Sequence, residues 1–280
     1  MRFELDAPLS IVTVDGYPLH YLEMGEGDPV LLVHGSLCDC RYWKPQMAPL
    51  ARGRRVIAVS LRHYWPSNSQ ADDGSFSVEQ HAEDLASLIQ AKGLPFAHVV
   101  GHSRGGRVAL ELALRHPGLV RSMVLADPGV HFADEGAVPA RSTFVTEATD
   151  RVKAGDIEGG LGLFVDSVNG ENTWARMVEG FRNMARENAH TLPGQAIEPR
   201  VSLSEDRLRG ASAPALLIGG AASPARYGQV LDRLASALPN SERLTIQGAA
   251  HGMNLAKPHS FNTALIKFLD HHARHDPISR

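Results

Sequence analysis

The chain has 280 residues, of which 43% are hydrophobic and 21% charged, so it is long enough for one large globular domain or for a core with an inserted subdomain. Its formal net charge of −3 argues against a nucleic-acid-binding protein or one held on anionic membranes. Neither a signal peptide nor a membrane-spanning segment is expected, because the first ten residues lack a basic region followed by an apolar run and no stretch approaches the roughly 18 apolar residues that a span needs.

Short apolar runs predict the strands of a mostly parallel sheet. Two β-rich segments, 11–14 and 18–24, flank Asp15-Gly16 and predict an N-terminal hairpin. The later runs are continuously apolar, which is typical of strands buried on both faces. They cover residues 29–34, 55–60, 97–101, 122–126, 214–219 and, more weakly, 242–247.

Amphipathic patterns between these runs predict helices, and the alternation indicates a sheet covered on both faces. The predicted helices cover residues 78–92, 104–116, 227–238 and 260–271. The segment from about 128 to 206 has no obvious buried strand and is interpreted as helices, including one over 173–190. We therefore expect a core made of residues 1–128 and 211–280, with a helical lid inserted at 129–210.

A candidate nucleophile lies where a predicted strand meets a predicted helix. The sequence Gly101-His102-Ser103-Arg104-Gly105 has the G-x-S-x-G pattern in that context, where small flanking residues permit a sharp turn. The helix that follows directs its N-terminal amides at negative charge developing beside the serine. The alternative is a purely structural turn, and the strand before and helix after favour a nucleophile.

The chain resembles the α/β-hydrolase superfamily over nearly its whole length, on this motif and on His34-Gly35-Ser36 at the end of an earlier strand. The resemblance implies a mostly parallel sheet with helices on both faces. It implies an oxyanion hole made by the backbone amides of Ser36 and Arg104, and a supporting role for His34. It also implies a general base after the last strand, where the sequence has His251.

The acid that would orient His251 is absent from its usual place, because residues 219–223 are Gly-Gly-Ala-Ala-Ser. Asp127 follows the strand after the nucleophile helix, and its Leu-Ala-Asp-Pro context resembles a minority branch that includes lactonases acting on the mycotoxin zearalenone. We predict that Asp127 is the orienting acid. The alternative is that Asp127 caps a helix starting near Pro128 and that a Ser–His dyad operates, helped by Ser223.

Residues beside the oxyanion loop and on the lid are candidates for substrate contacts. For Tyr64 and Trp65, packing against the core is an equal alternative. For Trp174, burial in the core of the lid is favoured over a substrate contact. Arg104 either faces a polar substrate or is a solvated helix-start arginine. The candidate set is Gly35, Leu37, Tyr64, Trp65, Trp174 and Met253. Trp174 shares its helical spacing with Met177 and Phe181.

The predicted activity is hydrolysis of a small-molecule carboxylic ester or lactone through an acyl-enzyme on Ser103, without metal or organic cofactor. The motifs do not separate this from C–C bond hydrolysis, from cofactor-free dioxygenation in which serine is dispensable, or from a non-catalytic binding protein of the same fold. The cysteines, Cys38 and Cys40, are too close for a structural disulfide and predict a cytoplasmic protein. Whether it forms a homodimer stays open.

Overall fold

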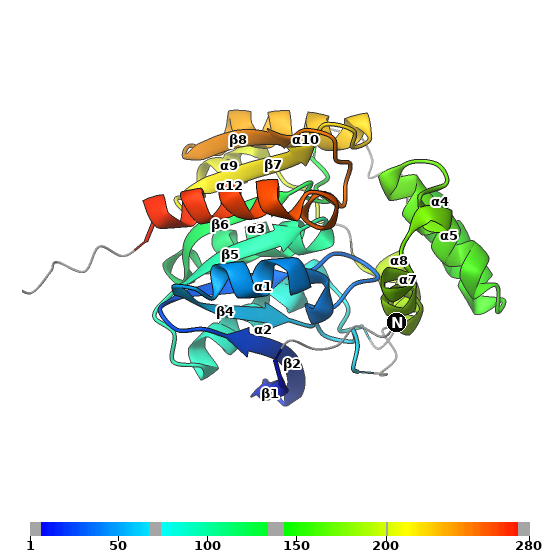
Figure 1. Cartoon of the computed structure of the whole chain (residues 1–280), viewed down its shortest axis with the longest axis horizontal. Coiled ribbons are helices and arrows are strands. Elements are labelled where there is room, and N and C mark those ends of the chain that lie inside the picture. The colour runs from blue at the N-terminus through cyan, green and yellow to red at the C-terminus, as the bar shows by residue number, and fades with distance from the viewer. Residues whose placement is uncertain (1–6, 68–73, 134–142, 200, 274–280) are drawn as a thin grey trace, which may run out of the picture.

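The computed structural model describes residues 7–67, 74–133, 143–199 and 201–273, which form an α/β protein around one sheet (Figure 1). The strands are β1 (Leu9–Val14), β2 (Tyr17–Met24), β3 (Asp28–Val33), β4 (Arg54–Val59), β5 (Ala97–His102), β6 (Val120–Ala126), β7 (Ala215–Gly220) and β8 (Ser241–Ile246). The α-helices are α1 (Lys44–Leu50), α2 (Val78–Ala91), α3 (Arg104–Arg115), α4 (Thr143–Lys153), α5 (Ile157–Asn169), α6 (Thr173–Arg176), α7 (Glu179–Glu187), α8 (Leu192–Ile197), α9 (Glu205–Arg209), α10 (Ala225–Ala237), α11 (Met253–Ala256) and α12 (Pro258–His271). Short 3₁₀ helices cover Cys40–Trp43, Pro117–Leu119 and Ala189–Thr191.

The sheet has eight strands in the order β1-β2-β4-β3-β5-β6-β7-β8. The pairs β1–β2 and β2–β4 are antiparallel, and all later pairs are parallel. The predicted fold class is confirmed, and the strands expected from apolar runs are all present within one or two residues of their expected limits. β5 and β6 are neighbours, so their carboxyl ends reach the same edge of the sheet.

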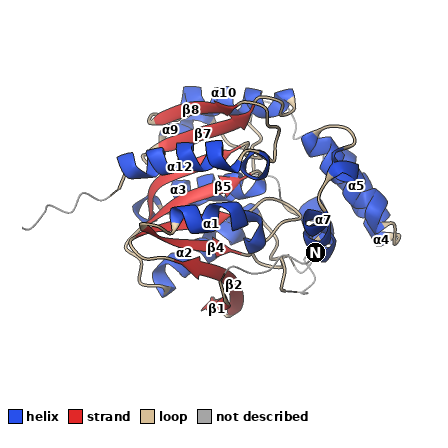
Figure 2. Ribbon diagram, viewed as in Figure 1, coloured by secondary structure: helices blue, strands red, loops and turns tan. Residues whose placement is uncertain are grey.

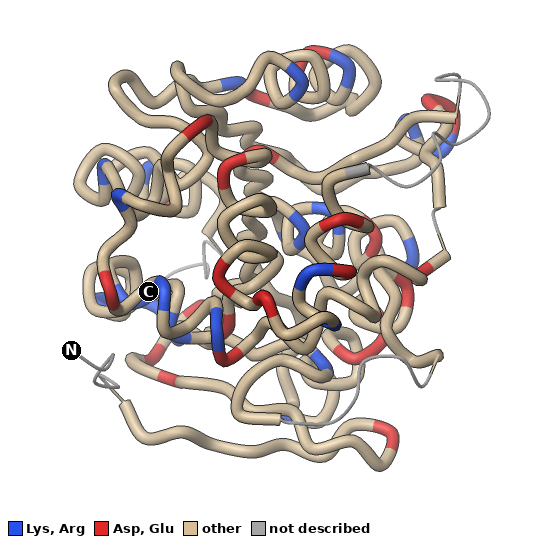
Figure 3. The backbone as a smooth tube through the Cα atoms, turned by 90° about the vertical axis from the view of Figure 1, so that its right-hand side faces the viewer, with Lys and Arg blue, Asp and Glu red and all other residues tan. Residues whose placement is uncertain are grey.

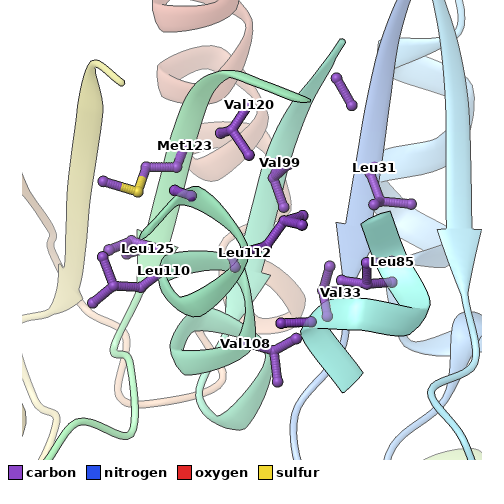
Figure 4. Packing of buried hydrophobic residues seen from close by; sticks show 14 of the residues in the cluster. Leu31, Val33, Leu85, Val99, Val108, Leu110, Leu112, Val120, Met123 and Leu125 are labelled. Carbon is purple, nitrogen blue, oxygen red and sulfur yellow. The ribbon is translucent and has the colours of Figure 1, made fainter. Parts of the chain in front are cut away.

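Helices cover both faces of the sheet (Figure 2). One face packs against α2, α3 and α10, with α3 contributing Val108, Leu110 and Leu112 to the contact with β5 and β6 (Figure 4). The other face packs against α1 and α12, where Trp43 and Phe261 are fully buried. Burial on both faces explains why the central strands are continuously apolar.

The segment between β6 and β7 contains α4 to α9, and we call it the insertion; α4, α5 and α7 lie to one side of the sheet in Figure 1. The predicted single helix over 173–190 is wrong, because Met177 and Val178 are extended and separate α6 from α7. The Asp166 carboxylate accepts the Trp174 N–H at 2.7 Å and ties α6 to α5. The end of α7 is instead attached to the core. The extended residues Met177 and Val178 let the chain change direction between α6, which is held by α5, and α7, which is held by the core.

The attachment to the core runs through Asn188, which is fully buried just after α7. Its side-chain amide donates to Asp39 Oδ2 at 2.8 Å, and its Oδ1 accepts the Trp65 N–H at 2.8 Å. Asp39 also accepts two hydrogen bonds from the Arg41 guanidinium, at 2.8 and 2.6 Å. The insertion is therefore joined to two core loops by directional polar bonds as well as by apolar packing.

Positively and negatively charged residues are interspersed over the chain rather than gathered on one element (Figure 3). Within the ranges that the structure describes, no helix combines the length and the hydropathy needed to cross a bilayer.

Candidate active site

Ser103 lies on the tight turn between β5 and α3, with φ 54° and ψ −119°. A non-glycine residue in this region of backbone space costs about 1–3 kcal/mol and persists only when its surroundings enforce it. The enforcement comes from two glycines. A Cβ on Gly101 would lie 2.2 Å from the Gly105 carbonyl oxygen, and one on Gly105 would lie 2.2 Å from the Val33 carbonyl oxygen. The G-x-S-x-G spacing thus lets β3, β5 and α3 approach closely enough to expose the serine on the turn.

Asp127 and His251 meet beside this turn. Asp127 follows β6 with φ 39°, in the left-handed region that aspartate tolerates better than most residues. His251 lies in the loop after β8, and its Nδ1 is 3.3 Å from Asp127 Oδ2. Residues 128–133 form no helix, so in this part of the chain Asp127 does not cap one.

Ser223 occupies the turn after β7 where the missing acid would be expected. Its hydroxyl donates to Asp127 Oδ2 at 2.6 Å, the same oxygen that faces His251. Gly219 leaves room for the carboxylate, since a Cβ there would lie 3.3 Å from Asp127 Oδ1. The turn after β7 therefore supplies a hydrogen-bond donor to a carboxylate that comes from the neighbouring strand.

Burial dominates the electrostatics of this pair. It raises the pKa of Asp127 to about 6, while the Ser223 hydroxyl acts in the opposite direction by stabilising the charged form. Burial lowers the pKa of His251, with a smaller contribution from the positive charge of Arg226. At neutral pH the carboxylate is ionised and the imidazole is neutral, which is the pairing that a general base requires.

Two rings hold the His251 loop in place. Tyr227, at the start of α10, stacks on the His251 imidazole with ring centroids 4.2 Å apart and planes at 21°. His102 Nε2 donates to the His251 carbonyl oxygen at 2.8 Å from the strand that leads to Ser103. No hydrogen bond joins Ser103 to His251 in this part of the structure; in unliganded enzymes such contacts often tighten only with substrate.

The backbone amides of Ser36 and Arg104 have no acceptor among the bonds of the described chain, and both residues flank Ser103. His34 holds the first of these loops, because its Nδ1 donates to the Gly35 carbonyl oxygen at 2.8 Å while its Nε2 accepts the Leu61 N–H at 3.0 Å. The two amides are therefore free to receive an external oxygen beside the serine.

Two cavities meet at Ser103 and Ser36. The larger has a volume of about 530 Å³, and His251, Leu37 and Phe181 are among its lining residues. The smaller has a volume of about 360 Å³ and is lined in part by Arg104, Arg226 and Gln195. Phe164 and Val168 of α5 border both cavities. Across the described ranges, no cluster of three or more His, Cys, Asp or Glu side chains is arranged to hold a metal ion.

The model of the alpha/beta hydrolase fold family matches residues 28–258, the segment that contains every group described above. The chain belongs to the α/β-hydrolase family. It is a hydrolase of that fold.

Among curated members of the α/β-hydrolase family, the chain is 30% identical over 270 residues to "Putative carbamate hydrolase RutD" of Caulobacter segnis, covering 92% of this chain and 98% of that protein. Among solved structures it is similar to Est816, an N-acyl homoserine lactone degrading enzyme, with TM-score 0.77 and 25% identity over 92% of this chain and 100% of the other. It also shares the fold of the enol-lactonase from Burkholderia xenovorans LB400, with TM-score 0.75 and 20% identity over 93% of this chain and 100% of the other.

Within this α/β-hydrolase site, only some of the sequence-predicted binding residues reach a cavity. Gly35 and Leu37 line the larger cavity, together with Met177 and Phe181 of the insertion. The other predicted contacts line neither cavity, because they pack inside the protein or on a loop: they are Tyr64, Trp65, Trp174 and Met253. Tyr64 packs edge-on against His34, and Trp65 lies beneath the Arg41 guanidinium. The aromatic residues Tyr64, Trp65 and Trp174 therefore follow the alternative to substrate contact, which was packing within the protein.

Arg104 is not solvated, and its charge is not available to a substrate. Its side chain is 6% exposed and forms an ion pair with Glu198, which follows α8. The guanidinium also lies over the Phe76 ring, 4.4 Å from its centroid. Sequence reasoning did not find Arg226, Tyr227, Phe164 or Gln195 as site residues, because nothing in a single sequence indicates that α5, α8 and the start of α10 converge on Ser103.

Proposed function

We propose that the protein hydrolyses a small-molecule carboxylic ester or lactone through an acyl-enzyme on Ser103. The observation that carries the proposal is the combination of a serine on a strained turn, a neutral buried imidazole and a carboxylate held 3.3 Å from that imidazole. The two unpaired amides beside the serine support it, since they could receive an oxyanion.

In the proposed reaction, Ser103 Oγ attacks the carbonyl carbon as His251 Nε2 takes its proton. The amides of Ser36 and Arg104 stabilise the negatively charged tetrahedral intermediate. Its collapse expels the alcohol, which receives the proton from His251, and leaves an ester on Ser103. Water activated by His251 then attacks that ester and releases the acid. Asp127 fixes the tautomer with hydrogen on Nδ1 and stabilises the imidazolium.

Treatment with a fluorophosphonate, followed by intact-mass measurement, tests the proposal. We expect a single adduct on the wild-type protein, because a serine activated by a general base attacks phosphorus as it attacks a carbonyl. Peptide mapping should place the adduct at Ser103, and the Ser103→Ala variant should acquire none. A folded wild-type protein that stays unlabelled and hydrolyses no ester would contradict the proposal.

The pH dependence of kcat/KM is expected to have an acid limb near pH 6, where the buried carboxyl of Asp127 has its pKa. The proposed reaction needs Asp127 ionised, so activity is present above this pKa and falls as the pH drops through it. Ser223→Ala removes the hydroxyl that stabilises the charged form, so the pKa should rise and the limb should move to higher pH. A pH–rate profile of both proteins checks this, and a limb that does not move would remove Ser223 from the site.

A further inference from the structure

The smaller cavity beside Ser103 carries more positive than negative charge. Among its described lining residues are the three arginines Arg104, Arg107 and Arg226, against a single carboxylate, Glu198. The larger cavity is different. Apart from Arg176 at its border, it is bounded mainly by apolar side chains such as Leu37, Phe181 and Leu255, and the described residues around it include no carboxylate.

Two of these arginines are already held in buried ion pairs inside the protein. Arg104 is paired with Glu198, as described above. Arg107 is paired with Glu111 at 2.8 Å, with both side chains almost fully buried, and Glu111 also pairs with Arg115 and Arg207. Neither can offer a full charge to a ligand without breaking a buried ion pair, and such a break is costly. Arg226 is therefore the arginine of this cavity that can pair with a ligand without breaking a buried ion pair.

Arg226 has no carboxylate within ion-pairing distance among the residues that the structure describes, yet it is held in position. Its guanidinium donates to the Ser167 carbonyl oxygen on α5 at 2.8 Å. It also lies over the Tyr227 ring, 4.8 Å from the centroid, and Tyr227 stacks on His251. Its positive charge reaches the candidate site, because it helps to lower the pKa of His251 and opposes part of the rise that burial causes in the pKa of Asp127. A preorganised cation without a counter-ion, beside a cavity, is what an anionic ligand group needs.

Resting on the serine-hydrolase function proposed above, we propose that the enzyme selects esters that carry a carboxylate or similar anion on the arm entering the smaller cavity, and that Arg226 is the residue that selects them. The apolar arm of the same substrate occupies the larger cavity. The scissile carbonyl lies where the cavities meet, at Ser103.

Matched ester pairs test this proposal, with the charge placed on either arm. Monophenyl glutarate and its methyl ester differ by a charge and a capping methyl group on the acyl arm, and 4-acetoxybenzoate and its methyl ester differ in the same way on the leaving group. In each case release of the phenol is followed, so that cleavage of the methyl ester does not count. For one of the pairs, we expect Arg226→Gln to lower the ratio of kcat/KM for the anionic over the neutral ester by about 2- to 5-fold, the effect of losing one partly exposed ion pair. Arg226→Lys should keep much of the preference, and salt should weaken it in the wild-type protein.

Arg52→Gln is the matched control, because it removes the same charge from an exposed residue in the turn before β4, at the opposite edge of the sheet. It should leave both ratios unchanged. Unchanged ratios for both pairs in Arg226→Gln, with neutral esters still hydrolysed in a Ser103-dependent manner, would overturn the role of Arg226 alone. Absence of Ser103-dependent hydrolysis from every ester would overturn the proposed function and this inference with it.

Discussion

Replacing Asp127 with asparagine is expected to lower kcat for ester hydrolysis by roughly 10³- to 10⁴-fold, as loss of the orienting acid does in the Ser-His-Asp template. The substitution preserves the shape of the side chain, which is fully buried, so the fold should persist. An amide in this place can donate a hydrogen to His251 Nδ1, which favours the tautomer with hydrogen on Nε2. That tautomer cannot accept the Ser103 proton. Steady-state kinetics and the rate of phosphonylation measure the effect together.

Asp232→Asn is the matched control, because Asp232 lies on α10 with its side chain 65% exposed and paired with Arg243. It should change kcat by less than about 2-fold, as exposed pairs contribute little. A second variant sharpens the test. Ser223→Asp in the Asp127→Asn background restores a carboxylate on the turn after β7, so partial recovery of activity is expected. Wild-type activity in Asp127→Asn would show that Asp127 does not orient the base.

The Gly105→Ala substitution is expected to destabilise the protein by more than about 4 kcal/mol or to prevent folding, a range reached only when a specific structural requirement is violated. The new methyl group would lie 2.2 Å from the Val33 carbonyl oxygen and 2.4 Å from that of His34. Both are backbone atoms, so relief requires β3 and α3 to separate. Thermal unfolding and soluble yield give the measurement.

The control for this glycine is Gly118→Ala, where an added Cβ would meet no atom within 4 Å. Because Gly118 lies in the short helix before β6, without a positive φ, this substitution should change the free energy of unfolding by less than about 1 kcal/mol. A Gly105→Ala protein as stable as Gly118→Ala would mean that the close approach of β3 and α3 is not required.

Sequence analysis predicted those site residues whose positions are determined by the path of the backbone. Strands buried on both faces have to be apolar throughout, and this placed Ser103 and Asp127 at the ends of two strands. Their proximity depended on β5 and β6 being neighbours, which is the common arrangement for consecutive strands joined by one helix. The glycines around Ser103 were informative for the same reason, since contacts between backbones leave no choice of side chain.

The residues that line the cavities could not be predicted in this way. Tyr64 and Met253 are the kinds of residue that line a pocket, and they are equally the kinds that fill a core, where the structure puts them. Tyr227 belongs to a helix pattern that gave no reason to single it out, and it reaches His251 only because the turn after β7 delivers the start of α10 to that loop. The positions of such side chains depend on how α5, α8 and α10 pack together, and the local periodicity of the sequence does not encode that packing.

The buried bonds of Asn188 have a consequence for how a substrate would reach Ser103. Lifting the insertion away from the core would strip Asp39 of one donor and leave the Trp65 N–H without its acceptor, and each such buried loss costs about 1–3 kcal/mol. We therefore expect the insertion to stay in place during turnover and not to open as a mobile lid. Substrate would enter and product would leave through the openings of the two cavities. Rotation of individual side chains such as Phe164 would control this access, and the size of the openings would limit which molecules are substrates.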